Sequence, residues 1–149
     1  MITFREARRT DVAAVVSLLV DDVLGQSREL ADMGPYETAF DRMQSEGGNL
    51  VIVGVDDSDA IVATYQVTFI SGLSLSAARR AQVESVRVVS YLRGQGVGKQ
   101  MFQDVETRAR AAGCNLIQLT MNQTREDSKR FYERLGFVAS HFGFKRSLT

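Results

Sequence analysis

A strand-like run that leads directly into a glycine-rich turn constrains this chain more than any other feature. Residues 83–89 (VESVRVV) are mostly apolar and β-branched, residues 93–99 (RGQGVGK) are rich in glycine, and residues 97–112 have a helical apolar pattern. Backbone N–H groups at the start of a helix have no partner within the helix, and the helix dipole adds partial positive charge there. The segment therefore predicts a strand–turn–helix unit whose turn can bind an anion.

The composition of the turn favours a pyrophosphate as that anion. Glycines at 94, 96 and 98 remove side chains, so the N–H groups can approach a phosphate oxygen closely, and Arg93 and Lys99 add charge at the two ends. A Walker loop would need Ser or Thr at Gln100, and the dinucleotide fingerprint would need its third glycine one residue later. We expect a nucleotide derivative here, with a simple turn as the structural alternative. The expected contacts are Arg93, Gly94, Gln95, Gly96, Val97, Gly98 and Lys99.

A second segment, residues 128–137 (SKRFYERLGF), belongs to a predicted short helix. Thr124 is expected to cap its start, and Gly136 follows its last apolar position, as a residue just beyond a helix often does. One face of the helix carries Ser128, Phe131, Tyr132 and Leu135. This face is either ordinary core or part of a ligand site.

Together, the two segments resemble the signatures of the GCN5-related N-acetyltransferases (GNAT). The pattern R/Q-x-x-G-x-G/A falls on Arg93, Gly96 and Gly98, and the pattern Y-E-x-x-G-F runs from Tyr132 to Phe137. The resemblance covers essentially the whole chain. It implies a single N-acetyltransferase domain over residues 1–149, with acetyl-CoA (acetyl-coenzyme A) as cosubstrate.

The resemblance also implies an activity. The chain would be an acyltransferase that moves an acetyl group directly from acetyl-CoA to a primary amine of a small molecule. Two alternatives stay open: an acetyl-CoA-binding sensor or interaction module without turnover, and a transferase acting on a protein or peptide amine. A homodimer and assistance by a divalent metal also stay open, although no metal ligands are predicted.

The pattern of elements predicts an α/β fold of the GNAT type. Its sheet should be twisted, mixed and mostly antiparallel, with about seven strands and helices on both faces. The expected order is β-α-α-β-β-β-α-β-α-β-β, with Thr10 capping the first helix. Strands are expected at 2–5, 49–55, 60–70, 81–89, 114–121, 137–140 and 143–148, and helices at 10–23, 36–44, 97–112 and 125–135.

The resemblance assigns the chemistry to two groups of residues. In the family, the central strand bulges and its backbone binds pantetheine and the acetyl carbonyl, which implies Val86, Arg87 and Val88 here. Glu84 is the candidate base that takes the proton from the amine, because Gln82 on the same strand face cannot accept one. A structural Glu84 is the alternative.

Tyr132 matches the family residue that donates a proton to the coenzyme A thiolate or orients its sulfur. Asn122, Ser128 and Phe131 are further candidates for cofactor binding, and Arg125 is an alternative to Asn122. The catalytic pair predicted from the resemblance is therefore Glu84 and Tyr132.

Composition excludes several other classes of protein. Eighteen basic residues balance 18 acidic ones in 149 residues, so no overall charge points to nucleic acid or membrane as a partner. Cys114 is the only cysteine and His141 the only histidine, which excludes an intrachain disulfide and a multi-histidine metal site. With no signal-like start and no long apolar run, we expect a cytoplasmic enzyme.

The acceptor amine stays open between two classes. The tail, which ends in residues 140–145 (SHFGFK), resembles the aminoalkylphosphonate N-acetyltransferases and makes His141 a candidate acceptor contact. Residues 21–46, however, are rich in acids, which would repel a phosphonate and attract a cationic amine unless they are ordinary solvated residues. The acids are Asp21, Asp22, Glu29, Asp32, Glu37, Asp41 and Glu46, against Arg28 and Arg42.

Overall fold

The structure is a computed structural model that describes residues 1–21, 29 and 32–149. The chain divides into two compact units, Met1–Gln118 and Leu119–Thr149. The expectation of a single domain over the whole chain stays a prediction.

The described strands form one five-stranded sheet in the order β1-β2-β3-β4-β5. The first three strand pairs are antiparallel. Asn115 N–H donates to Arg79 O over 3.0 Å, and the amide of Gln118 donates to Gln82 Oε1 over 2.7 Å. Both pairs are separated by the same 36 positions, so β5 runs parallel to β4 and the sheet is mixed, as predicted. The strands are β1 (Thr3–Glu6), β2 (Asn49–Val55), β3 (Ile61–Ser71), β4 (Arg79–Val88) and β5 (Leu116–Leu119).

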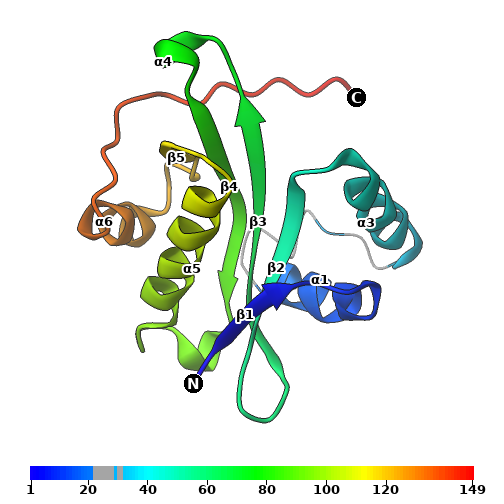
Figure 1. The fold of residues 1–149 in the computed structure, drawn as a ribbon. Helices are drawn as coiled ribbons and strands as arrows, with labels where there is room; N and C mark the ends of the chain where they lie inside the picture. Colours follow the sequence, from blue (N-terminus) through cyan, green and yellow to red (C-terminus); the bar gives the residue numbers. More distant parts are fainter. Residues whose placement is uncertain (22–28, 30–31) are drawn as a thin grey trace. The chain divides into compact units, whose positions relative to one another are not determined.

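Helices lie on both faces of this sheet, as predicted. Figure 1 shows α1 (Val12–Val20) and α3 (Gly34–Glu46) on one face and α5 (Val97–Ala111) on the other. Short helical turns complete the first unit: η1 (Arg9–Asp11) before α1, α4 (Ser74–Ala77) between β3 and β4, and η2 (Ser90–Leu92) after β4.

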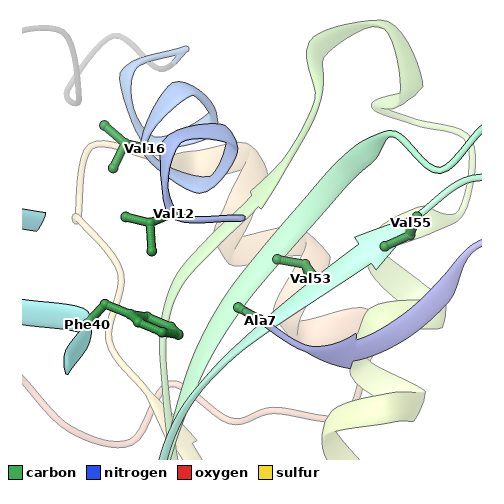
Figure 2. Close-up of a cluster of buried hydrophobic side chains, with 6 residues drawn as sticks. All are labelled: Ala7, Val12, Val16, Phe40, Val53 and Val55. Atoms are coloured by element: carbon green, nitrogen blue, oxygen red, sulfur yellow. The ribbon is translucent and has the colours of Figure 1, made fainter. Parts of the chain in front are cut away.

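Each face of the sheet has its own apolar core. On the α1 and α3 face, a buried cluster joins both helices to β2 (Figure 2); its members are Ala7, Val12, Val16, Phe40, Val53 and Val55. On the α5 face, Tyr65, Met101 and Val105 are fully buried, and the Tyr65 hydroxyl donates to Asp104 over 2.6 Å. Two cores on opposite faces account for the nearly continuous apolar run of β2 and for the burial of successive residues in β3.

Local turn chemistry agrees with the sequence at the β2–β3 hairpin and at the end of α5. Asp56 Oδ1 accepts the backbone N–H groups of Ser58 and Ala60, which is the turn chemistry typical of an aspartate between two strands. Gly113 follows α5 with a φ of +79°, as a C-terminal glycine commonly does.

The predicted capping of the first helix by Thr10 is wrong. Asp11 instead accepts the backbone N–H of Arg8 over 2.7 Å, and Arg5 of β1 donates to the same carboxylate over 2.7 Å and 3.2 Å. The partly buried Arg5–Asp11 ion pair thus joins β1 to the turn before the first helix. The helix was expected to continue to Val23, which lies outside the described residues; α1 itself ends at Val20.

In the second unit, α6 (Glu126–Arg134) ends as predicted but does not begin as predicted. Phe137 N–H donates to Tyr132 O and Gly136 N–H to Glu133 O, with a φ of +91° at Gly136, which is the pairing of a Schellman motif. Thr124 is not the cap, because its N–H and hydroxyl both donate to Asn122 Oδ1 in an Asx turn before the helix.

The two predicted final strands, 137–140 and 143–148, are not strands in the described structure, so the sheet has five strands and not about seven. Alternating apolar residues such as Phe142 and Phe144 indicate extended backbone. A strand also requires a partner that completes its ladder of hydrogen bonds, and sequence periodicity cannot supply that partner.

Candidate active site

A β-bulge interrupts the pairing of β4 with β3. Thr64 pairs with Arg87 and Gln66 with Glu84, so two positions along β3 match three positions along β4. The extra residue falls beside Ser85, whose φ of +55° is uncommon for any residue other than glycine. The ladder is disrupted at Ser85 and Val86 and resumes at Arg87 and Val88, which pair with Thr64 and Ala63.

The same pairing places the Glu84 and Arg87 side chains on the α1 and α3 face. Their partners Gln66 and Thr64 lie on that face, and paired residues share a face of the sheet. Glu84 is exposed, while Arg87 is half-buried and donates from Nη1 to Val86 O over 2.9 Å. The candidate base therefore lies beside the bulge, on the face that α1 and α3 cover.

The glycine turn forms an open cradle at the start of α5. Gly94 and Gly96 have φ values of +76° and +84°, and a Cβ built at either one would meet no atom within 4 Å. Gln100 N–H donates to Gly96 O, so the helical ladder begins there, and the first-turn N–H groups at Val97, Gly98 and Lys99 precede it. With no acidic residue in that turn, the cradle suits an anion such as a pyrophosphate.

Side chains of the turn mainly hold the turn itself. Arg93 donates from Nε to Val88 O over 3.1 Å and from Nη2 to Asp21 O over 3.0 Å. Gln95 donates to Tyr91 O over 2.9 Å, and Lys99 is exposed. Arg93 thus positions the turn as well as bringing charge to it. The contact with Asp21 had no signal in the sequence, because the two residues are 72 positions apart.

The remaining candidates belong to the second unit. Ser128, Phe131, Tyr132 and Leu135 form the half-buried face of α6, which confirms the predicted helix face. The Tyr132 ring makes edge-on contacts with Phe131 at 5.2 Å and with Phe137 at 5.9 Å between centroids. Asn122 lies in the turn before the helix. Glu84 and Tyr132 lie in different units, so their joint action stays a prediction.

The acids of residues 21–46 have local partners wherever the structure describes them. Arg9 pairs with Glu37 and Asp41, and Arg93 Nη2 lies 4.0 Å from Asp21 Oδ2. The other partners are Tyr36 for Glu29, Gly34 N–H for Asp32 and Asn49 for Glu46. Asp22 and Arg28 lie outside the described residues. This arrangement supports local structural roles for the described acids.

No helix among residues 1–21, 29 and 32–149 has both the length and the apolar character needed to cross a membrane. Within that same part of the chain, His, Cys, Asp and Glu side chains form no group of three suited to a metal ion.

The fold, the bulge and the glycine cradle agree with a family match. The model of the Acetyltransferase (GNAT) family matches residues 12–137, and the chain belongs to this family. The family assignment confirms the resemblance and the predicted class, an acyltransferase.

Individual relatives match different lengths of the chain. Over 67 residues it is 39% identical to the aminoalkylphosphonate N-acetyltransferase of Salmonella typhimurium, a match that spans 45% of this chain and only 44% of that protein. A structure described as a transcriptional regulator from Bacillus halodurans C-125 is 41% identical, with a TM-score of 0.94 over 99% of this chain and 100% of that one. An acetyltransferase from Clostridium acetobutylicum with acetyl-CoA shares only the fold, at 17% identity and a TM-score of 0.76 over 99% and 97% of the two chains.

Proposed function

We propose that this protein transfers an acetyl group from acetyl-CoA to the primary amine of a small molecule. The observation that carries the proposal is the bulge at Ser85 on β4, followed after a short connection by the open turn at Gly94 and Gly96. In a member of the acetyltransferase family, the bulge would suit the pantetheine and acetyl end of acetyl-CoA, and the turn would suit its pyrophosphate.

Binding would use mostly backbone groups. The first-turn N–H groups of α5 at Val97, Gly98 and Lys99 would hold the pyrophosphate by charge-assisted hydrogen bonds. The backbone of Val86, Arg87 and Val88 would bind pantetheine and the acetyl carbonyl, with further contacts from Asn122, Ser128 and Phe131. Bound acetyl-CoA supplies an activated acetyl thioester. Support comes from the family's use of acetyl-CoA and from the related fold solved with it.

Two side chains would move protons. Glu84 would accept the proton of the incoming ammonium, directly or through a water, which leaves a neutral amine able to attack the thioester carbon. Tyr132 would donate its phenolic proton to the sulfur as the carbon–sulfur bond breaks, and the second proton that the attacking nitrogen releases on becoming an amide would restore the phenol. The products are an acetamide and free coenzyme A.

A thiol-release assay tests this proposal. Acetyl-CoA is incubated with the protein and a panel of amines that includes aminoalkylphosphonates, polyamines and amino acids, and free thiol is measured by its reaction with a chromogenic disulfide. Mass spectrometry then identifies the acetylated product. Amine-dependent thiol release is expected, and its absence across the panel in a protein that binds acetyl-CoA would contradict the proposal.

The second candidate is an acetyl-CoA-binding sensor without turnover. It is favoured by the description of the Bacillus halodurans relative, 41% identical, as a transcriptional regulator. The two candidates differ in one measurement, because a sensor would bind acetyl-CoA by calorimetry and release no thiol with any amine.

A further inference from the structure

An apolar pocket lies between α1, α3 and the sheet, inside the first unit. Its volume is about 180 Å³. Its walls include Val15 and Val16 of α1, Phe40 and Met43 of α3, and Thr64 and Ser85 of the sheet. The pocket adjoins the buried cluster of Figure 2, since Val16 and Phe40 belong to both.

The pocket reaches the part of β4 where transfer is proposed. Ser85 at the β-bulge lines it, and so does Gln66, the β3 partner of Glu84. A molecule in this pocket would thus have one end among the apolar side chains of α1 and α3 and the other end near the bulge and Glu84.

The walls suit an apolar group and no charged one. No Arg, Lys, His, Asp or Glu of the described chain is among the lining residues. Most of the polar side chains that line it are engaged elsewhere: Thr64 Oγ1 donates to Ile52 O over 2.9 Å, and Gln66 Nε2 donates to Asn49 Oδ1 over 2.9 Å. The hydroxyls of Tyr36 and Tyr65 donate to Glu29 and Asp104 over 3.0 Å and 2.6 Å, which leaves the small Ser85 hydroxyl at the bulge. A phosphonate or a second ammonium placed there would lose its hydration without gaining a partner.

From this geometry we infer that the acceptor is a primary amine carrying an apolar group about the size of a phenyl ring or a short alkyl chain, which this pocket binds. The inference rests on the proposed function and specifies its acceptor. An apolar protein cavity of roughly 150 Å³ is known to take a benzene molecule, so about 180 Å³ is sufficient for such a group.

A series of amines tests the inference without any variant. Straight-chain primary amines from propylamine to octylamine are compared with 2-phenylethylamine, 2-aminoethylphosphonate and spermidine in the thiol-release assay. Because burial of a methylene is worth about 0.8 kcal/mol, kcat/KM should rise about three- to fourfold per methylene until the pocket is full. A flat profile, or preference for the phosphonate or the polyamine, would overturn the inference and leave the acetyltransferase function intact.

Two variants of the lining should shift the optimum in opposite directions. Ala39→Leu narrows the pocket and should move the optimum to shorter chains, whereas Met43→Ala widens it and should move the optimum to longer ones. Ala111→Leu on the exposed end of α5 makes the same change outside the pocket and should leave the profile unchanged. If Ala39→Leu only raises Tm and does not alter the profile, the space is a packing gap and the inference is wrong.

A binding measurement separates this inference from the proposed function. Methyl resonances of Val15, Val16 and Met43 are followed by NMR while 2-phenylethylamine is added in the absence of acetyl-CoA. Shifts in the wild type and in Ala111→Leu, but not in Ala39→Leu, support an apolar ligand in the pocket. If these methyl shifts occur while no amine is acetylated, the proposed function fails and the bound amine is not an acceptor. If acetyl transfer proceeds without the methyl shifts, the assignment of the pocket to the acceptor fails.

Discussion

The guanidinium of Arg93 donates a hydrogen bond of 3.0 Å to the main-chain carbonyl of Asp21, 72 residues earlier in the chain. A second hydrogen bond of 3.1 Å runs from Arg93 Nε to Val88 O. One side chain thus joins the residue after α1, the last residue of β4 and the glycine turn. Because the guanidinium is planar and presents several donors at fixed angles, it can hold both carbonyls at once.

Replacing Arg93 should loosen the turn and weaken cofactor binding. In Arg93→Lys the positive charge remains, but the side chain can no longer donate to the carbonyls of Asp21 and Val88 at once. The Kd of coenzyme A measured by calorimetry should therefore rise roughly five- to tenfold, which corresponds to about 1 kcal/mol. Arg110→Lys is the control, because Arg110 pairs with Glu106 at the solvent-exposed end of α5. An unchanged Kd in Arg93→Lys would mean that the turn holds its conformation without this side chain.

The glycine cradle is tested by a matched pair of substitutions. Gly96→Leu introduces a side chain at a φ of +84° where the pyrophosphate is proposed to bind, and should weaken coenzyme A binding by about 3 kcal/mol through lost charge-assisted hydrogen bonds. Gly113→Leu places the same side chain at a φ of +79° at the other end of α5, again with nothing within 4 Å, and so reproduces the backbone strain alone. Equal affinities in the two variants would remove the cofactor assignment from the cradle.

The proposed role of Tyr132 predicts a loss of rate with little loss of binding. Tyr132→Phe keeps the edge-on contacts with Phe131 and Phe137 but removes the hydroxyl, so kcat should fall roughly ten- to a thousandfold while the Kd of coenzyme A stays nearly constant. Tyr91→Phe removes a hydroxyl from an exposed tyrosine and serves as the control. Full activity in Tyr132→Phe would assign the proton to another donor.

Stability should depend on pH through Asp11. The hydrogen bonds from the Arg5 side chain, with that from Arg8 N–H, lower the pKa of this carboxyl below its ordinary value, although burial acts in the opposite direction. The stabilisation is therefore complete above the unfolded pKa of about 4 and is lost as the pH falls through the lower folded value. Asp11→Asn should reduce the free energy of unfolding by about 1–3 kcal/mol at neutral pH, and the difference from the wild type should shrink below about pH 4.

Urea unfolding of both proteins at several pH values measures that difference. Asp57→Asn is the control, since Asp57 pairs with the chain's amino terminus in full contact with solvent. A gap between Asp11→Asn and the wild type that stays constant down to the most acid pH would show that the Arg5–Asp11 pair does not cause the stabilisation.

Features that depend on residues close together in the chain could be predicted from the sequence. The strand–turn–helix unit around Gly96, the Asp56 turn and the glycine ends of α5 and α6 follow from hydrophobic period, backbone freedom and local hydrogen bonding, and the structure has all of them. The family match likewise rests on short patterns of residues. None of these features depends on which distant segments of the chain come into contact.

Features that depend on contacts between residues far apart in the chain could not be predicted in this way. Arg5 of β1 pairs with Asp11 before the first helix, and pairing with β3 locates the β-bulge at Ser85. The predicted final strands have no ladder in the described structure, because a strand is defined by its partner. The apolar pocket is likewise enclosed by side chains from α1, α3 and the sheet, whose approach depends on packing that no local pattern specifies.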